Sequence, residues 1–77
     1  MAYRTALDVS LRSSSICIVD DDGAIQFEDK ATSDVADIVA CLMRFDPAIE
    51  SVGFEAGALT QYLTYGLQTA GYEAICL

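Results

Sequence analysis

A change in hydrophobic period near residue 30 most constrains what this chain can fold into. Before it, apolar residues fall into short β-type runs over residues 4–10, 15–19 and 24–28. The last two runs flank Asp20-Asp-Asp-Gly23, and an Asp-Gly pair in that setting is a strong hairpin signal. The three runs predict an antiparallel meander whose third strand, alternating apolar and polar residues, lies at a sheet edge.

After residue 30, apolar residues recur every three or four positions, which indicates a helix. Thr32 or Ser33 is the expected N-cap, and Asp46-Pro47 is expected to end the helix. The apolar stripe of this helix comprises Val35, Ile38, Val39, Leu42 and Met43.

A strand over Glu50–Phe54, a loop and a second helix beginning near Thr60 follow. Gly66 would allow this helix to pack closely, and Gly71 stands where a left-handed terminator belongs. Residues 72–77 then predict a last strand. The apolar positions of the second helix are Leu59, Tyr62, Leu63, Leu67 and Ala70.

The predicted fold is therefore α/β with the element order β-β-β-α-β-α-β. Parallel crossovers are almost always right-handed, and this rule leads to a five-stranded mixed sheet of strand order 3-2-1-4-5. Both helices then lie on one face of the sheet. We expect the other face to be covered by a further part of the protein or by a second copy of it.

Asp8 is the residue of the first strand that most needs an explanation. Its neighbours Leu7 and Val9 suggest a buried strand, where a carboxylate is costly without a partner. Strands one and four are parallel neighbours in the predicted sheet, so Asp8 and Glu55 should meet at their C-terminal ends. Carboxylates suit Mg²⁺ or Mn²⁺, and we predict that both residues are metal ligands.

Other roles are open to the acidic and aromatic residues. Asp8 could instead pair with Arg4 or Arg12, or accept hydrogen bonds from the serines at positions 10 and 13. Glu55 could cap the helix that follows it. The acidic run at 20–22 lacks the spacing of a calcium loop and predicts a solvated turn. The tyrosines at 62 and 65 are expected to pack the helix rather than to stack on bases.

Composition narrows the functional classes. The formal charge of −8 argues against this segment alone forming a nucleic-acid-binding surface. Cysteines at 17, 41 and 76, with no histidine, exclude a typical structural zinc site and predict reduced core residues of a cytoplasmic protein. No signal peptide or membrane span is expected. The strand-like run at 74–77 suggests that the sequence is part of a longer protein.

Several short motifs together resemble a known family. They are Leu7-Asp-Val-Ser10, a hairpin ending in Asp-Asp-Gly, and Val52-Gly-Phe-Glu-Ala-Gly57, followed by the apolar positions of the second helix and Gly71-Tyr72. In this order they resemble the N-terminus of the DEDD insertion-sequence transposases, the IS-one-ten family, and the Glu-Ala-Gly version resembles its IS-eleven-eleven branch.

The resemblance implies that residues 1–77 are the N-terminal part of a RuvC-like domain of the ribonuclease H fold. It implies a transposase that cleaves and transfers DNA strands with four acidic residues and divalent metal. Asp8 and Glu55 match the first two as catalytic metal ligands, and two Mg²⁺ or Mn²⁺ ions are expected only in the complete site. DNA, a structured guide RNA and further copies of the protein are the implied partners of the full-length protein.

Two other functions are compatible with the element order. An actin-like sugar kinase or ATPase also begins with a meander carrying an aspartate on its first strand. The turn Ser10-Leu-Arg-Ser13 lacks the glycines that usually cradle phosphate there. A non-catalytic self-association module is the third possibility, because the predicted sheet has a bare face.

Overall fold

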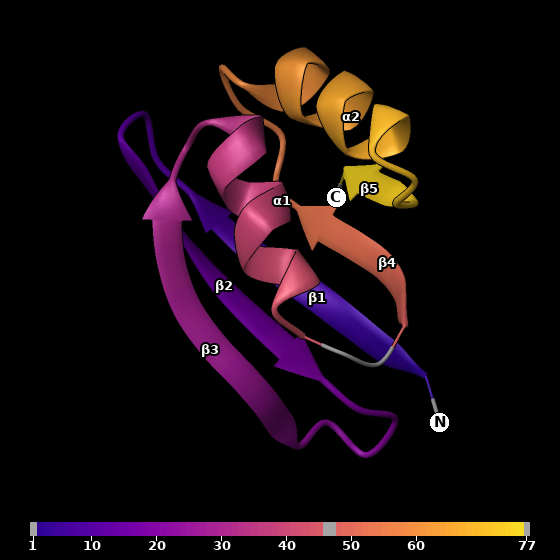
Figure 1. Cartoon of the computed structure of the whole chain (residues 1–77). Coiled ribbons are helices and arrows are strands. Elements are labelled where there is room, and N and C mark those ends of the chain that lie inside the picture. Colours follow the sequence, from indigo (N-terminus) through magenta and orange to yellow (C-terminus); the bar gives the residue numbers. More distant parts are fainter. Residues whose placement is uncertain (1, 46–47, 77) are drawn as a thin grey trace.

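Five strands form one mixed sheet, and two helices lie against it (Figure 1). The computed structural model describes residues 2–45 and 48–76. The predicted helix stop at 46–47 and the predicted strand end at residue 77 lie outside the described residues. The elements are β1 (Tyr3–Val9), β2 (Ser13–Val19), β3 (Ile25–Thr32), α1 (Val35–Met43), β4 (Ile49–Phe54), α2 (Thr60–Thr69) and β5 (Ala74–Cys76).

The strand order is β3-β2-β1-β4-β5, which confirms the predicted topology. β1 pairs antiparallel with β2 and parallel with β4, so it is the central strand. Leu7 lies opposite Ile16 of β2 and opposite Phe54 of β4. Because paired residues share a face of the sheet, this register places all three side chains on the same side.

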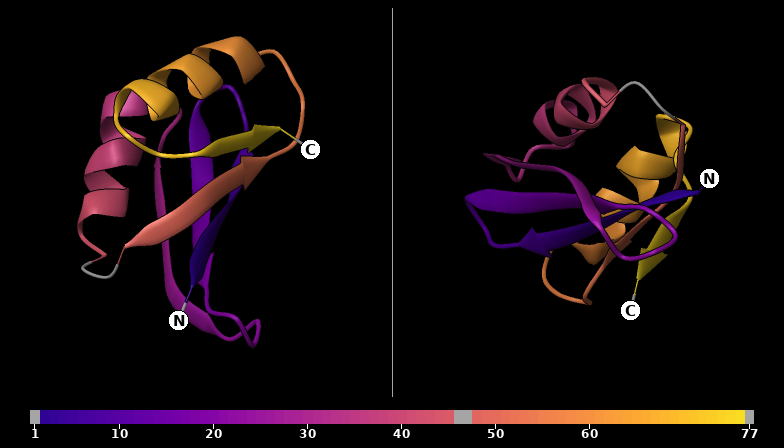
Figure 2. Two further views of the ribbon diagram at one scale, coloured as in Figure 1. Left: turned by 90° about the vertical axis from the view of Figure 1, so that its right-hand side faces the viewer. Right: turned by 90° about the horizontal axis from the view of Figure 1, so that it is seen from below.

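That side of the sheet is the core, and both helices cover it, as predicted (Figure 2). Side chains alternate along each strand, so every second residue turns away from the helices. None of the described helices or strands packs over this other face (Figure 2). The buried apolar residues are Leu7, Ile16, Ile18, Ile38, Cys41, Leu42, Val52, Phe54, Leu63 and Leu67.

The two helices touch each other at Gly66. A Cβ atom added at Gly66 would lie 2.6 Å and 2.7 Å from the two Cγ atoms of Val35. Glycine therefore permits the close approach that the sequence predicted. α2 then ends in the predicted manner, because Gly71 adopts a φ of +96°.

The start of α1 differs from the prediction. The N-cap is Asp34, whose carboxylate accepts a hydrogen bond from the Ala36 amide at 2.9 Å. Thr32 is still the last residue of β3, because that strand continues four residues beyond its predicted end at residue 28. The Ser33 hydroxyl is buried and hydrogen-bonds the Ser14 hydroxyl at 2.9 Å.

Three apolar positions, Met43, Ala70 and Cys76, are less buried than predicted. Met43 is 72% exposed, and Cys41 lies in the core face of α1 instead. Of the three cysteines, only Cys41 is buried; Cys17 is half-buried and Cys76 is exposed. The prediction of three core cysteines is therefore wrong at Cys76, which lies on the short edge strand β5. Neither α1 nor α2 has the length and apolar composition needed to cross a membrane.

The acidic turn between β2 and β3 is not simply a solvated loop. The Asp20 side chain is nearly buried and accepts hydrogen bonds from the amides of Asp22 at 2.9 Å and Ala24 at 3.0 Å. It also accepts one from the Gln26 side-chain amide at 2.8 Å. Asp20 therefore organises the hairpin, and the solvated-turn prediction is wrong for this residue.

Candidate metal centre

Asp8 and Glu55 occupy matching positions on two adjacent parallel strands. The last paired residues of β1 and β4 are Leu7 and Phe54, so Asp8 and Glu55 each come one residue later. Neighbouring strands lie about 4.8 Å apart. The structure therefore brings these two backbone positions together at the C-terminal end of the parallel pair, where the sequence predicted them to meet.

Both residues line one open cleft of about 610 Å³. The end of β1 and the turn after it form one wall, with Ser10 and Leu11. The end of β4, the loop at 56–58 and the start of α2 form the other, with Thr60. The cleft is thus lined by carboxylates, hydroxyls and apolar groups from two halves of the sheet.

Asp8 is exposed, so the expectation of a buried carboxylate is wrong. Its apolar neighbours Leu7 and Val9 turn toward the helices, whereas Asp8 turns to the uncovered face of the sheet. The apolar residues next to Asp8 in the sequence therefore do not surround its side chain in the fold. Because the Asp8 carboxylate is exposed to solvent, it carries no burial cost that a bound cation would have to offset.

The alternative partners suggested for Asp8 are engaged elsewhere or do not touch it. Arg4 approaches Glu50 at 4.0 Å instead. The Ser10 hydroxyl donates to the Ser13 carbonyl at 2.7 Å and accepts from the Ser13 amide at 3.3 Å. Within residues 2–45 and 48–76, the Asp8 carboxylate makes no ion pair or hydrogen bond, so its oxygens face solvent in the cleft.

Glu55 does not cap α2, contrary to the alternative considered for it. The helix begins at Thr60, its N-cap position is Leu59, and no side chain hydrogen-bonds there. Thr60 instead closes the preceding loop: its hydroxyl accepts from the Gly57 amide at 2.7 Å and donates to the Gly57 carbonyl at 2.9 Å. Glu55 itself is exposed, between the end of β4 and this closed loop.

The donor set fits a hard cation only in part. Two carboxylates without protein partners can ligate one Mg²⁺ or Mn²⁺ ion that keeps most of its water. Among the described residues, no group of three or more acidic, cysteine or histidine side chains comes together. Asp8 and Glu55 thus suit part of a metal site, and a two-metal site needs more ligands.

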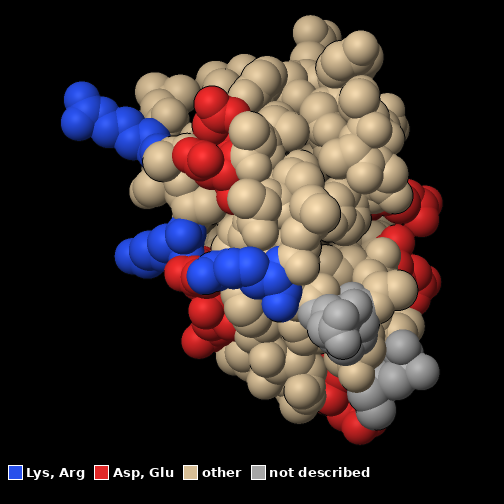
Figure 3. All heavy atoms as spheres, in the orientation of Figure 1, with Lys and Arg blue, Asp and Glu red and all other residues tan. Residues whose placement is uncertain are grey.

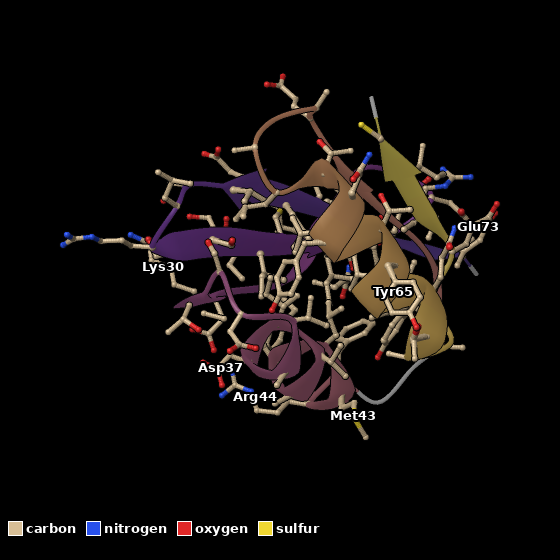
Figure 4. All side chains as sticks on the ribbon, turned by 90° about the horizontal axis from the view of Figure 1, so that it is seen from above. Lys30, Asp37, Met43, Arg44, Tyr65 and Glu73 are labelled. Atoms are coloured by element: carbon tan, nitrogen blue, oxygen red, sulfur yellow. The ribbon has the colours of Figure 1, made fainter. Side chains whose placement is uncertain are left out.

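The tyrosines of α2 have different surroundings. Tyr62 is about half exposed, and its hydroxyl accepts a hydrogen bond from the Val35 amide at 2.9 Å. Tyr65 is 74% exposed on the outer surface of α2 (Figure 4). The packing prediction is therefore wrong for Tyr65.

A second cleft, of about 550 Å³, escaped the sequence analysis. It lies between β3 and α1, and Lys30, Arg44 and Asp37 line it. These residues form no local sequence pattern, because β3 and α1 meet only through the fold. The one available signal was the scarcity of basic residues, four in the whole chain.

No family model matches this sequence, and no curated protein matches it. The strand order and the cleft are thus the basis for a functional proposal.

Proposed function

We propose that this chain is the N-terminal part of the RuvC-like domain of a DEDD insertion-sequence DNA transposase, in which Asp8 and Glu55 ligate Mg²⁺ or Mn²⁺. One observation carries the proposal: the two carboxylates follow a paired position on adjacent parallel strands and line one cleft. The strand order also agrees with the order that the resemblance implies.

Asp8 and Glu55 would have distinct tasks. Asp8 lies on the central strand and pairs with Ser15 of β2, one residue after the last pair with β4, so its backbone is held on the β2 side. Glu55 stands at a strand end, beside a loop closed by Thr60, and can adjust to the ion. A bound divalent ion would supply water activation and stabilise the leaving oxygen in phosphodiester cleavage.

The remaining parts of the proposal concern the full-length protein. Two further aspartates would complete the metal site, and DNA, a structured guide RNA and other copies of the protein would be its partners in the cytoplasm. We expect the 77-residue chain alone to be inactive as a nuclease, because two carboxylates cannot hold both ions of a two-metal reaction.

Manganese titration of the ¹⁵N-labelled chain tests the proposal. Paramagnetic broadening should begin at the amides around Asp8 and Glu55. Asp8→Asn and Glu55→Gln should each weaken binding roughly tenfold, about 1.4 kcal/mol. Glu73→Gln is the matched control: this exposed carboxylate precedes β5, away from the cleft, and its removal should leave the broadening unchanged.

Two results would contradict the proposal. Broadening spread evenly over the acidic surface would mean that manganese is only a counterion here. Tight binding of ATP, with no response to manganese alone, would favour the actin-like kinase or ATPase alternative.

A further inference from the structure

The positive charge of this acidic chain is concentrated at one edge of the molecule. Of the four basic residues, Arg12, Lys30 and Arg44 belong to the β1–β2 turn, β3 and the C-cap of α1, which lie toward the outer edge of the sheet. Figure 3 shows the basic side chains of the helix-bearing face on the β3 side, with acidic side chains among them, while α2 contains no charged residue. We call Arg12, Lys30 and Arg44 the cationic edge.

The side chains of Arg12 and Lys30 are positively charged and are not paired with an acidic residue that the structure describes. Neither forms an ion pair with any described residue, and both side chains are exposed. Lys30 projects from the free edge of the sheet, with Arg44 on the adjoining side of α1 (Figure 4). Since neither free charge is neutralised by a described residue, both remain available to an anionic ligand.

Arg44 is fixed in place rather than free. Its guanidinium pairs with Asp29, lies 5.6 Å from the Phe27 ring centroid and donates to the Cys41 sulfur at 3.4 Å. Burial raises the pKa of the Cys41 thiol, so that group adds no negative charge beneath it. Arg44 thus forms a rigid, partly neutralised wall of the second cleft.

Hydroxyl groups accompany the cations. Ser13 and Thr32 line the second cleft with Lys30 and Arg44. Asp37, an acidic residue that lines the same cleft, accepts a hydrogen bond from the Thr32 hydroxyl. Lysine, arginine and hydroxyl groups are the groups that contact phosphate oxygens, and here the Thr32 hydroxyl already donates to Asp37.

The cationic edge leads into the candidate metal cleft. Ser10 lines the metal cleft, Ser13 lines the second cleft, and Arg12 lies between them in one tight turn. The Ser10 amide donates to the Ser13 carbonyl at 2.9 Å, and the Ser33 amide donates to the Arg12 carbonyl at 3.2 Å. These bonds fix the turn against the start of α1, so Arg12 stands at the boundary of the two clefts.

We propose that the cationic edge binds the phosphodiester backbone of a nucleic acid and guides it around the turn at 10–13 into the cleft of Asp8 and Glu55. The backbone would contact Lys30 and Arg44 first and Arg12 last. This inference rests on the proposed function, since it assigns that function's substrate a path to the carboxylates. The formal charge of −8 argues against nucleic-acid binding by the segment as a whole, so the inference rests on the charges of Arg12 and Lys30, which form no ion pair with a described residue.

Titration of the labelled chain with a short DNA duplex in EDTA tests the path without any metal. Amide shifts should cluster at Arg12, Lys30 and the second cleft. The variant Arg12→Gln/Lys30→Gln should bind roughly tenfold more weakly, and the slope of log K against log salt should fall by about 2, near 0.9 for each phosphate no longer neutralised. Arg4→Gln is the control, because Arg4 lies at the opposite end of β1 and approaches Glu50.

The outcomes separate this inference from the proposed function. Shifts that are absent, or that respond equally to Arg4→Gln, overturn the nucleic-acid path. Stronger binding of poly-glutamate than of duplex DNA also overturns it, by indicating an acidic protein partner. The manganese titration of Asp8→Asn and Glu55→Gln reports on the metal site alone, so either idea can fail while the other stands.

Discussion

The Tyr62 hydroxyl of α2 accepts a hydrogen bond from the Val35 amide, the first amide of α1, across 2.9 Å. The same hydroxyl lies 3.4 Å from the Asp34 carboxylate, to which it can donate. The first amides of a helix have no partner within the helix. α1 is thus capped by its own Asp34 and by a residue of the other helix, which couples the two helices.

Replacing Tyr62 with phenylalanine should destabilise the fold by about 1 kcal/mol, because the Val35 amide loses its partner while the ring remains. Urea unfolding measures this directly. Tyr65→Phe is the matched control on the same helix: Tyr65 is 74% exposed, and removal of its hydroxyl should leave stability unchanged. An equal loss of stability in the two variants would mean that the hydrogen bond between Tyr62 and Val35 contributes nothing to the free energy of unfolding.

The strand order was predictable because few topologies satisfy the local signals. The Asp-Gly turn fixes a hairpin, and right-handed crossovers then place β4 and β5 on the far side of β1. The proximity of Asp8 and Glu55 followed from this order, since parallel strands end at one edge of the sheet. These features depend on chain direction and connection length, which a sequence displays.

The features that escaped prediction depend on pairings that a local pattern does not display. Asp8 was expected to be buried, but strand alternation sends Leu7 and Val9 to one face and Asp8 to the other. β3 extends to Thr32 because β2 offers it partners from Ser13 onward, and this moves the helix cap to Asp34. Lys30 and Arg44 meet only when β3 packs beside α1.

Gly66→Ala should destabilise the chain by about 1–3 kcal/mol through overpacking. Alanine favours a helix by about 1 kcal/mol over glycine, so a net destabilisation would identify the clash as the larger effect. The clash is with Val35, whose Cγ atoms would lie 2.6 Å and 2.7 Å from the new methyl group. Thermal unfolding of the purified variants provides the measurement.

A second substitution separates the clash from other effects of Gly66→Ala. In a Val35→Ala background the two Cγ atoms are gone and only the Cβ atom of residue 35 remains close, at 3.1 Å, so the added methyl group should cost much less or become stabilising. Gly57→Ala is the control outside the helix, since nothing lies within 4 Å of a Cβ there. If Gly66→Ala is equally harmful with and without Val35, the contact between the helices is not the cause.

Asp20→Ala should destabilise the hairpin by about 2 kcal/mol or more, because hydrogen bonds to a charged acceptor contribute about 1.5–3 kcal/mol. The substitution removes the acceptor of the Asp22 and Ala24 amides and of the Gln26 side chain. Asp22→Ala is the control: it also removes one carboxylate, two residues after Asp20, but the Asp22 side chain is exposed, so this substitution should have little effect on stability. Similar destabilisation in both variants would argue for a charge effect.

Thr5→Val should stabilise the fold by about 1 kcal/mol, the reverse of most core substitutions. Thr5 is only 3% exposed, and its hydroxyl finds no hydrogen-bond partner in the part of the chain that the structure describes. Valine keeps the shape and removes the unsatisfied hydroxyl from the core face of β1, where Ile18 and Val52 lie opposite on the neighbouring strands. For a domain of this size the melting temperature should rise by about 4–8 °C.

Thr69→Val provides the comparison, because it makes the same chemical change at an exposed position at the end of α2 and should leave the melting temperature nearly unchanged. A lower melting temperature for Thr5→Val would show that the hydroxyl has a partner in solution, such as a bound water. In that case the centre of β1 would hold a satisfied polar group on the strand that carries Asp8. A rise limited to Thr5→Val would instead identify this position as a purely apolar part of the core.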